Sequence, residues 1–244
     1  MLTKDQAKEY WYEKQEQARK TMRLHECNSA VLIECASKVL VNGLYPDLEF
    51  SARLDRSIEL YHKLSSNDTK VHIYVPGSLH RELVSDYSDS SKIITSPIYV
   101  ADKCTLSTAG RQYLIERGVL NSDILGDQEN VLYKGDEGVL NSADECFVAS
   151  KLFHNGSIIN GKHYDYRELH CVCSPIQVTR KWFYYLEFGI VPLIHSVPFA
   201  GSDVMDIVTE QLRGTENVIY NDHNAQSHDS EIWINSQKER KGNE

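Results

Sequence analysis

The chain has 244 residues, of which 41% are hydrophobic and 25% are charged, so its composition is that of an ordinary globular protein. Its 35 acidic and 26 basic side chains give a formal net charge of −9, which disfavours binding to the phosphate backbone of nucleic acids. No run of 18 apolar residues is present and charged residues begin at Lys4, so we expect no membrane association, no secretory signal and a cytoplasmic location.

Residues 3–24 combine many Lys, Glu and Gln residues with a few spaced apolar ones, which predicts an amphipathic helix. We expect a single domain in which residues 1–27 form a helical extension whose apolar side chains offer a surface for self-association. Residues 28–200 would form the core. Residues 201–244 contain few apolar side chains and are expected to be a partly frayed extension.

Short apolar runs alternate with stretches of helical spacing, and this alternation predicts a Rossmann-like α/β fold with a mostly parallel sheet and extra terminal helices. The expected strands are residues 30–34, 71–75, 123–126, 169–173 and 190–195. The expected helices between them are residues 52–64, 105–117, 141–153 and 175–188. Thr105 or Ser107 would cap the second of these helices and Gly118 would end it, and turns are expected at Asn155-Gly156 and Asn160-Gly161.

Six cysteines are spread over the chain, several of them inside apolar runs, which indicates buried free thiols and not a disulfide framework. Cys171 and Cys173 would share one face of a strand. No second Cys/His pair at metal-ligand spacing accompanies them, so we expect no metal site.

Ligands of open parallel sheets bind beyond the carboxyl ends of the strands, so the loops that follow the strands contain the candidate site residues. None of these loops carries a dinucleotide, P-loop or nucleophile-elbow motif. Glu34, in the first strand, is the candidate catalytic base. The candidate ligand-binding residues of these loops are Ser37, Gly77, Ser78, Asn141, Ser142, Glu145, Ser174, Gln177 and Arg180.

The segment that begins at Ser142 matches the S-x-x-E pattern of a helix capping box, which leaves two interpretations open. In the first, Ser142 and Glu145 satisfy backbone donors at the start of the helix. In the second, Asn141 and Ser142 contact a ligand oxygen at the positive end of the helix dipole.

The segment Ser174–Arg180 carries the strongest signal for a ligand. Ser174 would cap a helix and Pro175 would take its first position. Gln177 and Arg180, three residues apart, share a helix face. A cation near a helix start is electrostatically unfavourable, so Arg180 indicates an anionic partner, either a ligand or a neighbouring carboxylate.

The chain resembles the YdcF/SanA/ElyC family, a group of Rossmann-like domains, from about Ala30 to Pro198. The resemblance is carried, in order, by Ala30–Glu34, Ser51–Tyr61, Pro76–Ser78, Ser107–Ala109, Tyr113–Val119, Asn141–Glu145 and Ser174-x-x-Gln177-x-x-Arg180. It implies a Rossmann-like sheet and a ligand such as S-adenosylmethionine, and it adds Arg53 and Ser107 to the candidate ligand-binding residues. The family often has His at the position of Gln177, and an amide cannot exchange a proton near neutral pH.

The leading hypothesis is a domain that binds a small polar or anionic ligand, nucleotide-like or S-adenosylmethionine-like, as a transferase or hydrolase. The first alternative is a non-catalytic sensor or binding module that has lost the family's His. The second is a structural or interaction protein that self-associates through residues 3–24.

Overall fold

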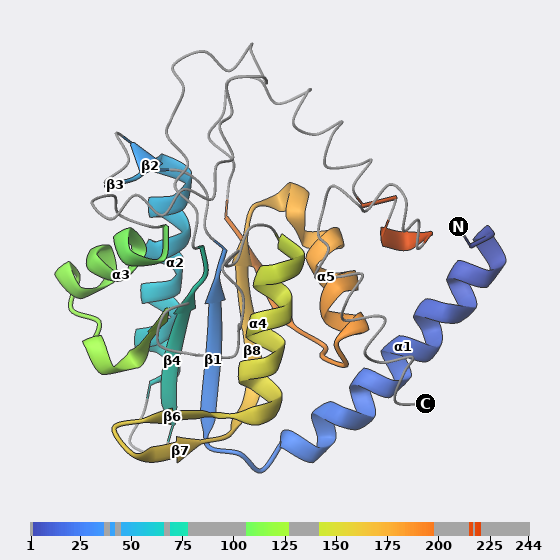
Figure 1. The fold of residues 1–244 in the computed structure, drawn as a ribbon, viewed down its shortest axis with the longest axis horizontal. Helices are drawn as coiled ribbons and strands as arrows, with labels where there is room; N and C mark the ends of the chain where they lie inside the picture. Colours follow the sequence, from blue (N-terminus) through green and yellow to red (C-terminus); the bar gives the residue numbers. More distant parts are fainter. Residues whose placement is uncertain are drawn as a thin grey trace.

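A computed structural model describes residues 2–36, 40–41, 45–65, 69–77, 106–126, 142–197, 215–216 and 218–220. A five-stranded parallel sheet lies between helices, as the ribbon in Figure 1 shows, and this confirms the predicted α/β fold class. The strands of this sheet are β1 (Ala30–Cys35), β4 (Lys70–Val75), β5 (Ile124–Gly126), β8 (Tyr166–Cys173) and β9 (Leu193–Ser196).

The strands lie side by side in the order β5-β4-β1-β8-β9. Starting from β1, the chain builds the sheet outward through β4 and β5 and then returns to the other side of β1 with β8 and β9. All four pairings are parallel, and Glu34 of β1 lies opposite Tyr74 of β4 and Cys171 of β8. The strand order therefore reverses between β1 and β8, which makes this position the topological switch point of the sheet. Ligands of open α/β sheets bind at such a point.

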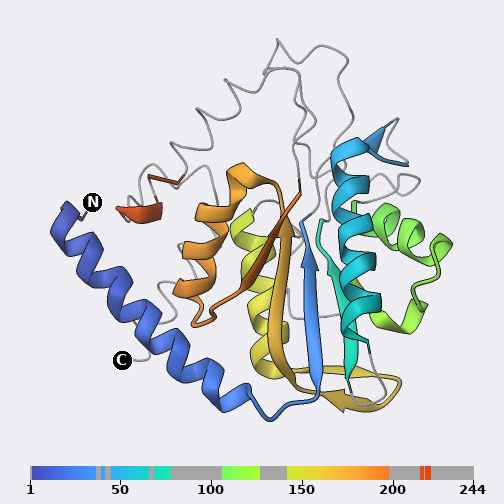
Figure 2. The same ribbon diagram turned by 180° about the vertical axis from the view of Figure 1, so that it is seen from behind.

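Two helices cover each face of the sheet (Figure 2): α2 (Leu48–Leu64) and α3 (Leu106–Glu116) lie on one face, and α4 (Ser142–Asn155) and α5 (Val178–Glu187) lie on the other. Every residue of β1 is fully buried because its side chains point alternately into the two cores. Val31 and Ile33 pack with α2 and α3, whereas Ala30 and Leu32 pack with α4 and α5.

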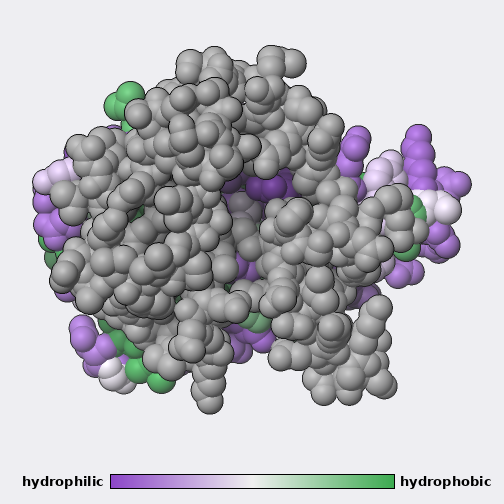
Figure 3. All heavy atoms as spheres, turned by 45° about the horizontal axis from the view of Figure 1, so that its top comes forward, coloured by the Kyte–Doolittle hydropathy of each residue, from purple (hydrophilic) through white to green (hydrophobic). Residues whose placement is uncertain are grey.

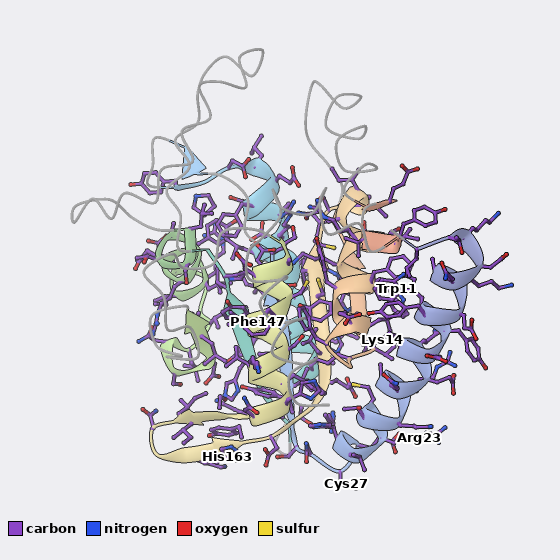
Figure 4. All side chains as sticks on the ribbon, turned by 45° about the vertical axis from the view of Figure 1, so that its right-hand side comes forward. Trp11, Lys14, Arg23, Cys27, Phe147 and His163 are labelled. Carbon is purple, nitrogen blue, oxygen red and sulfur yellow. The ribbon has the colours of Figure 1, made fainter. Side chains whose placement is uncertain are left out.

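The predicted N-terminal helix is present as α1 (Lys4–His25), which packs against α5. The Trp11 indole donates to the carbonyl of Ile219, and Lys14 forms an ion pair of 3.1 Å with Glu187 of α5. In Figure 4 Trp11 and Lys14 extend from α1 toward α5, and Arg23 lies near the far end of the helix. Among the described helices none is long and apolar enough to cross a membrane.

Two short antiparallel pairs form two-stranded sheets of their own: β2 (Leu40–Val41) pairs with β3 (Tyr45–Pro46), and β6 (Ser157–Ile159) pairs with β7 (Lys162–Tyr164). Asn160 and Gly161, predicted as a turn, both have positive φ, at 51° and 77°. Two successive positive φ values are typical of the two-residue type I′ turn that closes a hairpin. Single-turn 3-10 helices occur at Asn121–Asp123 (η2) and Pro175–Gln177 (η3).

The glycines of this region allow a matched test of backbone strain. A Cβ on Gly156, where φ is 70°, would lie 2.6 Å from the Tyr164 carbonyl oxygen, whereas a Cβ on Gly161, where φ is 77°, would meet no atom within 4 Å. We expect Gly161→Ala to lower the free energy of unfolding by about 1–2 kcal/mol, the cost of a left-handed conformation. Gly156→Ala should cost roughly 1–3 kcal/mol more, because the steric clash adds to it. Urea unfolding of both variants measures the difference, and equal losses would contradict the clash.

Two sequence predictions about element boundaries are wrong. The last strand begins at Leu193 and not at Ile190, because the Ile190 N–H donates to the Tyr185 carbonyl as part of the end of α5, and Pro192 has no N–H for a strand ladder. Ser107 lies inside α3 and does not cap it: its hydroxyl donates to the Val75 carbonyl at 2.7 Å. Thr105, the other cap expected for this helix, lies outside the described residues.

Among the described residues, four of the five cysteines are buried free thiols, as predicted, and Cys104 lies outside these residues. Cys35, Cys146, Cys171 and Cys173 are buried and free, while Cys27, just after α1, is free and exposed.

Candidate functional site

The candidate site lies where β1 and β8 end at the carboxyl edge of the sheet. Ala36 follows β1, and Ser174 follows β8 and leads directly into η3 and α5. α4 begins on the same side of the sheet at Ser142. Figure 3 looks obliquely onto this edge, and hydrophilic residues are visible near the centre of the view.

Ser174 and Gln177 form a local cap at the start of η3. The side-chain oxygen of Gln177 accepts hydrogen bonds from the Ser174 N–H at 3.3 Å and from the Ser174 hydroxyl at 3.1 Å. Ser174 therefore begins the helical segment with Pro175 at its first position, as predicted. Gln177 has a structural partner in the neighbouring loop, which accounts for its amide oxygen without a ligand.

Arg180 reaches from α5 to the first residue of α4. Its Nη2 donates to the Ser142 hydroxyl oxygen at 3.2 Å, and the side chain is buried, with the residue only 9% exposed. The buried Nε of the same guanidinium has no hydrogen-bond partner among the described residues. Within the described part of the chain, Arg180 thus forms no ion pair with a carboxylate.

Directly beside Arg180, Lys181 joins three elements through a buried ion network. Its ammonium lies 2.7 Å from a carboxylate oxygen of Glu34 on β1 and 2.8 Å from one of Glu145 on α4. Burial disfavours the charged ammonium, but the carboxylates of Glu145 and Glu34 outweigh it and raise the pKa of Lys181 well above its ordinary value. Lys181 therefore stays charged at neutral pH.

Two further donors surround Glu34. The Cys171 thiol donates to its second carboxylate oxygen at 2.8 Å, and the Tyr185 hydroxyl donates to the same oxygen at 3.2 Å. Burial, together with the nearby charge of Glu34, raises the pKa of both groups well above their ordinary values, so both remain protonated. Glu34, the expected catalytic base, is fully buried and held by Lys181, Cys171 and Tyr185.

The other described candidate residues, Arg53, Gly77 and Ser107, contact the ends of β1 and β4. Arg53 of α2 is fully buried, donates to the Ala36 carbonyl at 3.0 Å and forms an ion pair with Glu49. Gly77 has a φ of 121°, a value suited to glycine, and its carbonyl accepts from the Ser107 N–H. These contacts are structural and belong to the β1 and β4 ends. Ser37, Ser78 and Asn141 lie outside the described residues.

Sequence reasoning missed Lys181 and Tyr185 and assigned Glu145 to a cap or a ligand contact. A signal was present: Gln177, Lys181 and Tyr185 follow one another at four-residue spacing, so a lysine stands in the stripe of α5 that faces the sheet. A cation in a buried stripe requires a buried carboxylate nearby. The sequence does not show which carboxylates form ion pairs with Lys181, because that depends on how β1 and α4 pack against α5.

No group of three or more His, Cys, Asp or Glu side chains in the described ranges could hold a metal ion. The strand order and the polar residues at the β1–β8 edge define a Rossmann-like α/β protein with a charged site at the point where the order reverses. Searches against protein-family models, curated proteins and solved structures give no significant match to this chain.

Proposed function

We propose that the protein binds a small polar ligand at the carboxyl edge between β1 and β8, with an anionic group of the ligand on Arg180. The observation that carries this proposal is the guanidinium of Arg180, which is buried, donates to a neutral hydroxyl, and has an Nε without a partner among the described residues. A buried cation without a counter-charge is costly, so such groups are usually paired. An anionic ligand would supply the missing charge.

The surroundings of Arg180 support a ligand, and not a carboxylate of the protein, as the anion that pairs with its guanidinium. The two buried carboxylates of the ion network, Glu34 and Glu145, are engaged by Lys181. Arg53, the other buried arginine of this edge, is paired with Glu49. The proposed ligand is a nucleotide-like or S-adenosylmethionine-like molecule, and the proposed activity is that of a transferase or hydrolase; the resemblance to the YdcF/SanA/ElyC family supports the S-adenosylmethionine-like ligand.

A second candidate function, binding without catalysis, is favoured by the state of two residues. Glu34, the expected base, is fully buried and ion-paired with Lys181, and the Gln177 amide oxygen is occupied by Ser174. A general base needs access to the proton that it removes. In this alternative the domain senses or carries its ligand, and turnover assays with nucleotide and sugar-nucleotide panels distinguish the two functions.

Arg180→Ala tests the binding function directly. We expect ligand affinity to fall by about 1.5–3 kcal/mol, roughly 10- to 150-fold, because a charge-assisted hydrogen bond is lost. The measurement is calorimetry with whichever nucleotide or S-adenosylmethionine shifts the melting temperature of the wild type. Arg19→Ala is the matched control, since Arg19 is an exposed arginine of α1 that pairs with Glu16. Unchanged affinity in Arg180→Ala would remove Arg180 from the site.

A further inference from the structure

The start of α4 and the Arg180 guanidinium converge at one point of the edge. Ser142 is the first residue of α4, a helix of 14 residues, and its hydroxyl oxygen accepts from Arg180 Nη2 at 3.2 Å. Because that oxygen is the acceptor, its own hydrogen points elsewhere, and it has no acceptor among the described residues. At this point the Arg180 guanidinium, whose buried Nε has no hydrogen-bond partner among the described residues, meets the Ser142 hydroxyl and the positive end of the α4 dipole.

From this convergence we infer that the anionic group bound here is a phosphoryl group, an inference that rests on the proposed function and narrows its ligand class. A phosphoryl group has several terminal oxygens arranged as a tetrahedron, so it can accept from a guanidinium, a hydroxyl and a helix N-terminus that approach from different directions. A carboxylate has two oxygens in one plane, and the fork of a single arginine satisfies both.

The local charges distinguish the two ligand classes that the sequence left open. S-adenosylmethionine carries an ammonium and a sulfonium close to its carboxylate, and both would be brought near the buried cation Arg180. A phosphate ester brings only negative charge to it. Glu145, an acid in the first turn of α4, is directed toward Lys181, and Asp144, the other acid of that turn, is fully buried and has partners of its own.

The inference is tested with inorganic phosphate, AMP, adenosine and S-adenosylmethionine, titrated separately into the full chain by calorimetry and phosphorus NMR. We expect phosphate to bind in the millimolar range, and AMP to bind at least as tightly. Arg180→Ala should weaken phosphate binding by about tenfold or more, the effect of removing a charge-assisted contact. Ser142→Ala should weaken it by about three- to tenfold, the effect of one neutral hydrogen bond. Arg19→Ala should leave it unchanged, and S-adenosylmethionine should not bind.

The outcomes separate this inference from the proposed function. If S-adenosylmethionine binds in an Arg180-dependent manner and phosphate does not, the site takes a carboxylate, so the phosphoryl assignment is wrong and the proposed function stands. If phosphate binding is unaffected by Arg180→Ala, the phosphate is adventitious and the phosphoryl assignment is again wrong. If none of the four probes binds through Arg180, both proposals fail. Melting temperatures of the variants show whether any loss of binding reflects unfolding.

Discussion

We expect Lys181→Met to lower the free energy of unfolding by about 3–5 kcal/mol, the cost of removing one partner from a buried ion network. Lys181 is fully buried and neutralises Glu34 and Glu145, which are also buried. Methionine has a similar length and an apolar end, so it fills the space without supplying a charge. Two buried carboxylates would then lose the Lys181 ammonium.

The comparison variant is Arg56→Met, which removes an ion pair with Glu59 in which both side chains are exposed. This pair should contribute about 1 kcal/mol or less, because solvent screens both charges. Urea unfolding at pH 7 measures both. A loss below about 1 kcal/mol for Lys181→Met would show that the network is dispensable for stability.

Lowering the pH should partly rescue Lys181→Met. Without the cation, burial raises the pKa of a carboxyl group above its unfolded value. The folded variant then binds protons more readily than its unfolded chain, so the deficit relative to wild type shrinks as the pH falls from 7 toward 5. Retention of the full deficit at pH 5 would exclude uncompensated carboxylates as its cause.

His72 should make the protein sensitive to acid. It lies fully buried in β4, and its Nδ1 is 2.8 Å from the hydroxyl of Tyr166. Burial lowers the pKa of His72 to about 4, with a smaller contribution from Lys70 and opposition from Asp123. A histidine in the unfolded chain has a pKa of about 6.5. The unfolded state therefore binds this proton first as the pH falls.

The sign of the effect follows from these two pKa values. The stability associated with neutral His72 is complete above pH 6.5 and is lost progressively as the pH falls from about 6.5 to about 4. The total loss is on the order of 3 kcal/mol, since each pKa unit corresponds to about 1.4 kcal/mol.

His72→Asn isolates this loss, because asparagine can still form a hydrogen bond with the Tyr166 hydroxyl but does not titrate. Wild type and variant are unfolded in urea at several pH values between 7 and 4. We expect the stability of the wild type to fall more steeply than that of the variant, by about 3 kcal/mol over the whole range. Parallel pH profiles would mean that His72 is accessible to protons in the folded state.

The sequence by itself determined the fold class and the approximate location of the five strands of the parallel sheet. β1 could be recognised because Ala30–Ile33 is an unbroken apolar run, and such a run is required where both faces of a strand are covered. The alternation of strands with helices also implied parallel pairing, because a crossover helix returns the chain to the same edge. Gly118 and Gly189, with φ of 88° and 75°, lie at the ends of helices. Such glycines can be recognised from the sequence alone, because glycine adopts the left-handed conformation that ends a helix without strain.

The tertiary structure decided which candidate residues meet. Gln177 and Arg180 share a helix face in the sequence, yet Gln177 is bound to Ser174 while Arg180 extends to Ser142 on α4. Lys181, one residue further along, enters the core because Glu34 and Glu145 lie opposite it. Local spacing fixes the direction of a side chain relative to its own helix, but its partner depends on strand order and on the packing of helices distant in sequence. For this reason the sequence determined the fold class and the edge at which to look, and only the tertiary structure separated the unpaired Arg180 from the paired charges around it.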